Sequence, residues 1–209
     1  LSIRNWLKDM NKLLKLKPEH ISAYSLTVEP STKLFNLVKN KELLMPLKKI
    51  DIEQFLLTKE ILSKNGYKHY EISSYAKDSM ECKHNLHYWD LSPYLSFGPS
   101  AHSYNLEKRW WNYRSLDKYT ETLSNNLIPI KDHESLSKSD NYNETILNGL
   151  RLSKGLDLSI IKHQYNKNFE DYINQLQNKW DCIDIKNNFL QLNKNGMLLV
   201  DKISSDMFI

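Results

Sequence analysis

The sequence is poor in several features that mark common protein classes. It has 2 cysteines and 5 glycines among 209 residues. Cys82 and Cys182 lie far apart and offer no disulfide framework, so we expect a reducing, cytoplasmic compartment. The longest apolar runs are far shorter than the roughly 20 residues of a membrane span. Basic and acidic residues are interspersed, which argues against a basic tail that binds nucleic acid.

The first part of the chain alternates between helical and extended patterns. Ser2 is placed to cap a helix over 2–16, whose apolar residues recur at helical spacing. Further on, the patterns predict a strand, two helices and a second strand, over 20–29, 32–40, 51–65 and 67–73. This order predicts parallel α/β packing. Two or three strands cannot close a barrel, so this region would form only part of one.

The middle of the chain has a weaker pattern. Residues 75–113 are rich in His, Tyr and Trp, and we expect loops there with a short helix and a short strand over 94–97. A helix is predicted over 115–125. The stretch 126–137, which carries Pro129, is predicted to be a linker. The predicted domains are therefore 1–125 and 138–209.

The last part reads as three helices, a hairpin and a final helix. A helix starting at Ser139 or Asp140 opens it, and Asn187-Asn188 is suited to a tight hairpin turn. This pattern predicts a winged-helix-like α+β domain. Its candidate recognition helix carries Glu170 and Asp171 near its start, which disfavours phosphate contact. We therefore expect packing or protein contact rather than nucleic-acid binding.

The densest group of chemically active side chains lies at 82–89. On a helix, His84 and His87 would share a face and could hold a metal or ligate haem iron, beside the aromatic surfaces of Tyr88 and Trp89. The structural alternative is that both histidines are ordinary surface residues, the aromatic rings belong to the core, and Asn85 bonds backbone. A zinc site with Cys82 is a further alternative, although three local ligands fall short of the usual four.

Two other segments give weaker signals. Gly98-Pro99 follows the predicted strand at 94–97, where small residues let a ligand approach the backbone, but a simple turn explains them equally well. Glu71, near the end of a predicted strand, and Glu29 are candidates for a base or a polar ligand contact, or for a structural hydrogen bond at the sheet rim.

Five segments in order resemble a known family. They are HISAYSLTVEP at 20–30, GYKHYEISSYA at 66–76, HNLHYW at 84–89, YLSFGPSAH at 94–102 and LRLSKGL at 150–156. The set resembles radical S-adenosylmethionine (SAM) proteins of the HemW type, haem chaperones related to the oxygen-independent coproporphyrinogen III oxidases. Ser31, Ser96 and Pro99 stand where relatives often carry glycine, which affects local loop geometry.

The resemblance implies a fold and a set of ligands. The fold would be the C-terminal part of a radical-SAM partial (β/α) barrel, followed by the winged-helix-like domain. A 4Fe–4S cluster and S-adenosylmethionine would belong to the full-length parent, on ligands upstream of Leu1, and this fragment alone would do no radical chemistry. The HNxxYW motif implies haem contact, which carries over to these positions: His84, Asn85, His87, Tyr88 and Trp89. Thr27 and His102 would face the barrel interior.

The resemblance also sets the functional hypotheses. The leading one is a chaperone that binds haem or a porphyrin and delivers haem to client proteins, including membrane-associated ones. One alternative is radical oxidative decarboxylation of coproporphyrinogen III in porphyrin biosynthesis. Another is a non-catalytic winged-helix interaction module.

Overall fold

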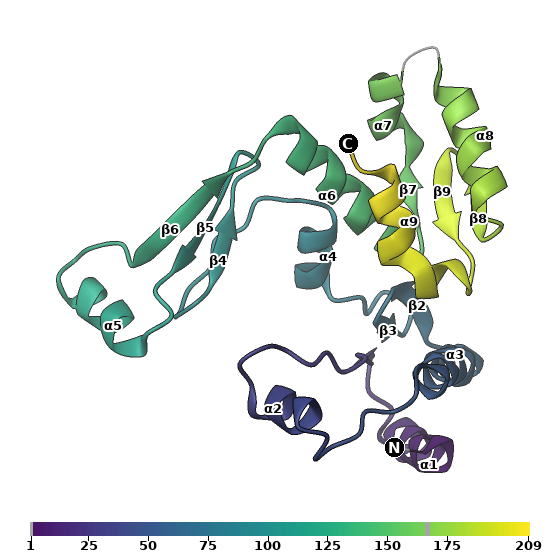
Figure 1. Cartoon of the computed structure of the whole chain (residues 1–209), viewed down its shortest axis with the longest axis horizontal. Helices are drawn as coiled ribbons and strands as arrows, with labels where there is room; N and C mark the ends of the chain where they lie inside the picture. The colour runs from purple at the N-terminus through teal and green to yellow at the C-terminus, as the bar shows by residue number, and fades with distance from the viewer. Residues whose placement is uncertain (1, 166–167) are drawn as a thin grey trace. The chain divides into compact units, whose positions relative to one another are not determined.

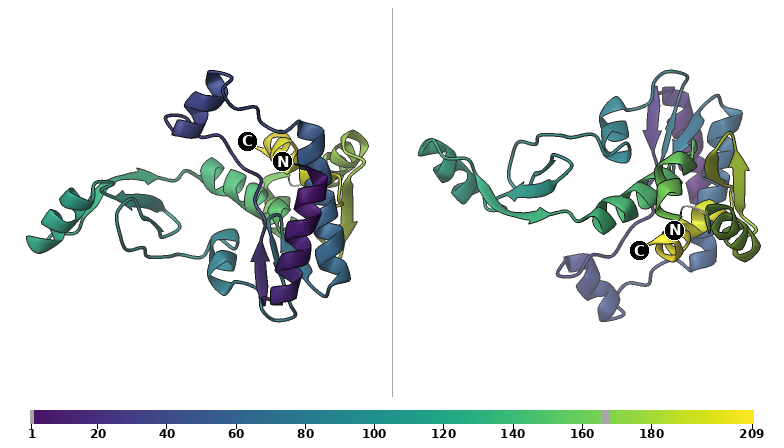
Figure 2. Two further views of the ribbon diagram at one scale, coloured as in Figure 1. Left: turned by 90° about the horizontal axis from the view of Figure 1, so that it is seen from below. Right: turned by 90° about the horizontal axis from the view of Figure 1, so that it is seen from above.

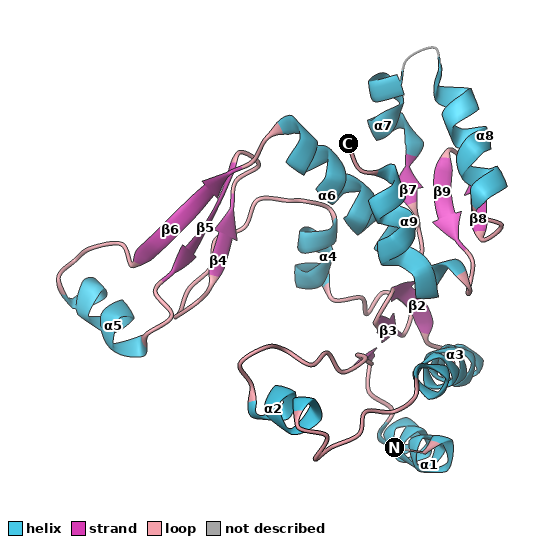
Figure 3. Cartoon of the chain, viewed as in Figure 1, coloured by secondary structure: helices cyan, strands magenta, loops and turns pink. Residues whose placement is uncertain are grey.

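A computed structural model describes residues 2–165 and 168–209; Leu1, where the predicted first domain begins, lies outside them. The chain forms two compact units, Leu1–Cys82 and Lys83–Ile209, each described here by itself (Figures 1 and 3). The fold is mixed α/β, as predicted. Within the described residues every helix is too short or too polar to cross a bilayer.

The first unit opens with the predicted amphipathic helix, α1 (Ile3–Leu16). The side chain of Ser2 accepts a hydrogen bond from the backbone N–H of Asn5, which caps the start of the helix. Lys17 ends it in the left-handed conformation, with φ of 50°. Pro18 follows and cannot continue a helix.

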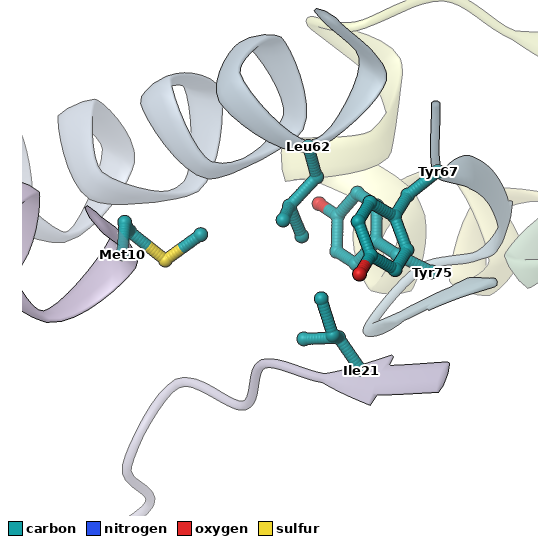
Figure 4. Packing of buried hydrophobic residues seen from close by; sticks show 5 residues of the cluster. All are labelled: Met10, Ile21, Leu62, Tyr67 and Tyr75. Carbon is teal, nitrogen blue, oxygen red and sulfur yellow. The ribbon is translucent and has the colours of Figure 1, made fainter. Parts of the chain in front are cut away.

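A small core joins α1 to the strands and to helix α3 (Lys48–Lys64). Figure 4 shows its five buried members, Met10, Ile21, Leu62, Tyr67 and Tyr75. The Tyr67 hydroxyl donates to the carbonyl oxygen of Pro18 at 2.7 Å, so its polar end is satisfied inside the core. Full burial of an aliphatic side chain such as Leu62 contributes roughly 1.5–3 kcal/mol.

The sheet of this unit corrects the prediction of parallel packing. Its order is β1-β3-β2, with β1 (His20–Ser22), β2 (Lys68–Glu71) and β3 (Ser74–Ala76), and both strand pairs are antiparallel. A tight turn after Glu71 reverses the chain, so β3 inserts between β1 and β2. Those two strands run in the same direction but are not neighbours.

The predicted strand over 20–29 is also too long. The N–H of Ala23 still donates to the carbonyl oxygen of Ser73, but the strand ends at Ser22. Because β3 begins at Ser74, the chain beyond Ala23 has no partner strand among the described residues. Tyr24 and Leu26 are 72% and 63% exposed instead of packed on one face.

Helix α2 (Lys33–Lys39) lies within its predicted span, with Thr32 as its cap. Helix α3 begins at Lys48, three residues before its predicted start at Asp51. The Asp51 carboxylate accepts hydrogen bonds from the Ser25 hydroxyl at 2.8 and 2.9 Å, so it ties a loop to the helix. Gly66, with φ of 83°, follows the helix, where a positive φ favours glycine.

The second unit begins with α4 (Lys83–Trp89) and an antiparallel sheet in the order β4-β5-β6. Strands β4 (His102–Tyr104), β5 (Lys108–Asn112) and β6 (Ile130–Ser135) extend away from α6, with α5 (Leu116–Ser124) beyond them (Figures 1 and 2). The predicted strand over 94–97 is reduced to a single bridge between Tyr94 and Tyr104. The stretch 126–137, predicted as a linker, contains strand β6, five of whose residues have partners in β5.

The C-terminal region follows the predicted order of elements. It comprises α6 (Lys138–Arg151), β7 (Leu156–Asp157), α7 (Leu158–Tyr165), α8 (Phe169–Lys179), β8 (Ile183–Lys186), β9 (Phe189–Leu192), the 3₁₀ helix η2 (Gly196–Leu199) and α9 (Val200–Met207). Ser137, not Ser139, caps α6 in a capping box with Asp140. Asn187 and Asn188 both have positive φ, which confirms the tight hairpin turn.

Gly155 lets the chain pass close to β9. Its φ is 87°, and a Cβ atom there would lie 2.4 Å from the carbonyl oxygen of Leu190. Only glycine combines this backbone conformation with such a close approach. The strands of this sheet stand in the order β7-β9-β8, and both pairs are antiparallel.

Candidate functional site

Helix α4 divides the predicted haem-contact residues between two faces. A helical residue turns by about 100° relative to its predecessor, which places His84, His87 and Tyr88 on one face. All three are exposed. Asn85 and Trp89 lie on the other face and are half-buried. The five predicted contacts therefore lie on both faces of the helix, and Tyr88 and Trp89 adjoin in the lining of one cavity.

On the exposed face, His84 and Tyr88 hold each other in place. The Nε2 atom of His84 lies 3.0 Å from the Tyr88 hydroxyl, and the two rings meet edge to face at 5.1 Å. The His87 imidazole has no hydrogen bond or ring contact with any described residue. A neutral imidazole with a free nitrogen is a ligand for iron or another transition metal.

A series of aromatic rings continues from Tyr88 into the sheet. Tyr94 contacts Tyr88 with ring centroids 4.6 Å apart and contacts Tyr104 at 5.8 Å. The backbones of Tyr94 and Tyr104 exchange two hydrogen bonds of 2.9 Å. Edge-to-face and tilted pairs of this kind are favourable ring geometries. They fix the orientation of Tyr88 relative to β4.

Arg109 joins this aromatic series to α6. Its guanidinium lies 5.8 Å from the centre of the Tyr104 ring and pairs with Glu134 at 3.0 Å and Glu144 at 2.7 Å. Burial disfavours the Arg109 cation, but the two carboxylates outweigh that effect and raise its pKa. Arg109 is therefore a fixed charge that holds β5, β6 and α6 together.

The inner face of α4 packs against α6. The guanidinium of Arg151 lies 5.6 Å from the centre of the Trp89 ring, and the side-chain amide of Asn148 donates to the Tyr88 carbonyl oxygen at 3.2 Å. Two cavities of about 430 and 320 Å³ border Trp89. They share Trp89, Leu91 and Tyr104 as lining residues.

The other predicted contacts lie away from α4. Thr27 is exposed in the extended segment of the first unit. His102 is exposed on β4 of the second unit, where its ring stacks on Trp111 with centroids 5.5 Å apart. A role for either residue in a barrel interior stays a prediction.

Gly98 lies in a turn, as the simpler interpretation of its sequence predicts. The N–H of Gly98 bonds the Tyr119 hydroxyl, and its carbonyl oxygen accepts from the Asn112 side chain, so this segment is a bonded turn. Glu71 is the buried last residue of β2, and its charge adds to burial in raising the pKa of Tyr75.

The cysteines do not assemble a metal site. Among residues 2–165 and 168–209, no three His, Cys, Asp or Glu side chains are arranged to hold a metal ion, so the zinc alternative gains no support. Cys182 is buried in the second unit and Cys82 ends the first. A 4Fe–4S cluster is held by several cysteine thiolates, so these two cysteines do not fit one.

The prediction missed several residues around α4, and only some of them carry a signal in the sequence. Tyr94 and Arg151 lie in segments of the family resemblance, whereas Tyr104 and Arg109 lie outside them and become neighbours of the site only in three dimensions. The division of α4 into two faces could have been read from its helical spacing alone.

Comparison with known proteins gives three consistent findings. Residues 136–199 match the model of the HemN C-terminal domain family. The chain is 31% identical over 185 residues to heme chaperone HemW of Mycobacterium tuberculosis, covering 88% of this chain and 46% of the relative. It is 31% identical over 161 residues to heme chaperone HemW of Bacillus subtilis, covering 77% and 42%. The chain thus spans about half the length of the curated relatives it matches.

The fold matches that of a solved enzyme. The structure of coproporphyrinogen III oxidase (HemN) from Escherichia coli, described as a radical SAM enzyme, aligns with a TM-score of 0.72 and 16% identity. The match covers 98% of this chain and 51% of the enzyme, and at this identity it shows the fold alone.

The relatives place the chain in the HemW family, and residues 136–199 match the HemN C-terminal domain family. Within that family, the curated relatives at about 31% identity carry the name heme chaperone HemW, which confirms the resemblance found in the sequence.

Proposed function

We propose that this chain is part of a haem chaperone of the HemW type and that the exposed face of α4 contacts haem. The observation that carries the proposal is the pair of exposed imidazoles, His84 and His87, on one face of a helix whose sequence is the HNxxYW motif. Imidazole is a common axial ligand of haem iron. The names of the relatives support haem as the cargo.

The neighbouring aromatic rings supply the remaining contact. Tyr88 is 38% exposed and is fixed by His84 on one side and by Tyr94 on the other. A porphyrin that lies against this face would meet a ring held in place before binding, which lowers the entropy cost of binding. Asn85 and Trp89, on the inner face, would support the helix rather than touch the iron ligand.

The larger architecture of the parent protein is part of the same proposal. The first unit would belong to the partial (β/α) barrel, and the order β7-β9-β8 with α6, α7 and α8 suits a winged-helix arrangement used for packing. The 4Fe–4S cluster and S-adenosylmethionine would be held by residues outside this chain. Delivery of haem to client proteins in the cytoplasm, including membrane-associated clients, belongs to the full-length protein.

A titration of ferric haem into this chain tests the proposed contact. We expect the His84→Ala, His87→Ala double variant to bind haem at least about tenfold more weakly, a loss of about 1.4 kcal/mol or more. His133→Ala, which removes an exposed histidine of β6, is the matched control and should bind like the parent chain. Equal affinity of the double variant and the parent chain would remove both histidines from the site.

A further inference from the structure

We propose that the segment joining α2 to α3, residues 39–49, docks on the surface of an anionic lipid bilayer. This segment, called the leucine loop below, exposes three leucines between two pairs of lysines. It belongs to the first unit, whereas the face of α4 proposed to contact haem belongs to the second. The proposal therefore concerns a separate surface and does not depend on the haem contact.

Leucine side chains form the exposed apolar part of the leucine loop. Leu43, Leu44 and Leu47 are 42%, 84% and 62% exposed. The preceding helix α2 has no buried residue, and it stands apart from α1 and α3 in Figures 1 and 2. Apolar side chains in water are stabilised by transfer to an apolar phase, and the boundary between lipid headgroups and acyl chains provides one to a protruding loop.

Lysines lie on both sides of these leucines. Lys39 and Lys41 precede them, Lys48 and Lys49 follow them, and Glu42 is the one acidic residue between positions 39 and 50. All four lysines are exposed, and none forms an ion pair with a carboxylate in the described part of the chain. A lysine near an anionic bilayer raises the affinity about fivefold. The charge of the loop therefore complements anionic lipid headgroups.

Two of these lysines occupy positions that a helix disfavours. Lys48 and Lys49 are the first two residues of α3, where the helix macrodipole stabilises acidic rather than basic side chains. Leu47, at the cap position, offers no side-chain hydrogen bond to the helix. The residues at this helix start therefore do not serve the stability of the helix, and an anionic apolar surface at the same place accounts for them.

A second exposed apolar loop lacks the basic residues. Leu127 and Ile128, which follow α5, are 62% and 76% exposed, but positions 122–130 contain no charged residue. Stable attachment to a membrane usually takes two signals, such as an apolar group together with a basic patch. The leucine loop carries both signals, and the loop after α5 carries only the apolar one.

Co-sedimentation of the full chain with phospholipid vesicles tests the proposal. We expect binding to vesicles of phosphatidylcholine mixed with phosphatidylglycerol, and at least about tenfold weaker binding to phosphatidylcholine alone or in high salt. The Leu44→Asn, Leu47→Asn double variant should bind the mixed vesicles at least about tenfold more weakly. The Leu127→Asn, Ile128→Asn double variant is the matched control and should bind like the parent chain.

The Lys48→Gln, Lys49→Gln double variant separates binding from folding. It should bind the mixed vesicles at least about tenfold more weakly, while its melting temperature by circular dichroism stays equal or rises, because two cations leave a helix N-terminus. Equal binding by the parent chain and both loop variants, or no binding by the parent chain, would overturn the proposal. Self-association of the parent chain that the leucine variant loses, without vesicle binding, would assign the loop to a second copy and overturn it too.

Discussion

Acidification should destabilise the first unit through His69. The imidazole stacks on Tyr75 with ring centroids 4.4 Å apart, and its Nε2 atom lies 3.1 Å from the carbonyl oxygen of Ile72. Burial, together with the charge of Lys59, outweighs the hydrogen bond to Ile72 and lowers the pKa of His69 from 6.5 to about 4. The unfolded chain therefore takes up this proton at a higher pH than the folded chain does.

The sign and size of the effect follow from that difference. Well above pH 6.5 both states are neutral at His69, and its contribution does not change with pH. Stability falls as the pH drops from 6.5 toward 4, because only the unfolded state gains the proton. Linkage gives a loss of about 2 kcal/mol at pH 5 and about 3 kcal/mol at lower pH. The ring is partly exposed, so these are upper values.

Hydrogen exchange of the β2 and β3 amides, corrected for the intrinsic effect of pH, measures the stability of this unit at pH 8 and pH 5. The parent chain should lose protection at the lower pH. In His69→Phe the ring remains and the titrating group is gone, so the difference between the two pH values should shrink by about 2 kcal/mol. His133→Phe is the control. An equal pH dependence in His69→Phe and the parent chain would refute the reasoning.

Three substitutions should lower the stability of the fold, each by removing or obstructing one local contact. Leu62→Ala should cost about 2–5 kcal/mol in urea denaturation, because it opens a cavity in the first core; a cost below 1 kcal/mol would contradict its burial. Gly155→Ala should lower the melting temperature of the second unit, because the new Cβ would collide with the Leu190 carbonyl oxygen and φ is positive there; an unchanged melt would argue against that close approach. Ser137→Ala should cost about 1 kcal/mol by removing the cap of α6, and the Asp140 backbone amide should then exchange faster.

The elements that could be predicted from the sequence are those with local signals. Ser2 and Ser115 mark helix starts that the structure shares, and the two asparagines at 187–188 specify a turn that needs positive φ at both positions. Such signals act within a few residues along the chain. They survive in the fold because tertiary contacts do not oppose them.

The strands were harder to predict because their pairing depends on distant residues. Strand β6 is exposed along its length and rich in charged residues. It therefore lacks the alternation of apolar and polar residues that predicts a strand. The segment after Ser22 shows the reverse case: it alternates like a strand but finds no partner strand among the described residues. Pairing, rather than pattern, decides whether an extended segment becomes a strand.

For the candidate site, the sequence identified the helix but not its surroundings. The HNxxYW segment contains the two histidines and Trp89, and the short helix expected within 75–113 lies there as α4. The contacts of Arg109 with Tyr104 and Glu144 join residues of β4, β5 and α6. The cavity beside Trp89 is lined by residues from further elements, among them α7 and β9. These arrangements exist only once the second unit has folded.

The electron paramagnetic resonance spectrum of ferric haem bound to this chain tests the central claim most directly. If the exposed face of α4 ligates the iron, the parent chain should give a signal typical of imidazole-bound ferric haem. The His84→Ala, His87→Ala double variant should lose that signal, whereas Trp89→Phe, altered on the opposite face, should keep it. An imidazole signal that persists unchanged in the double variant would contradict the assignment of haem to this helix.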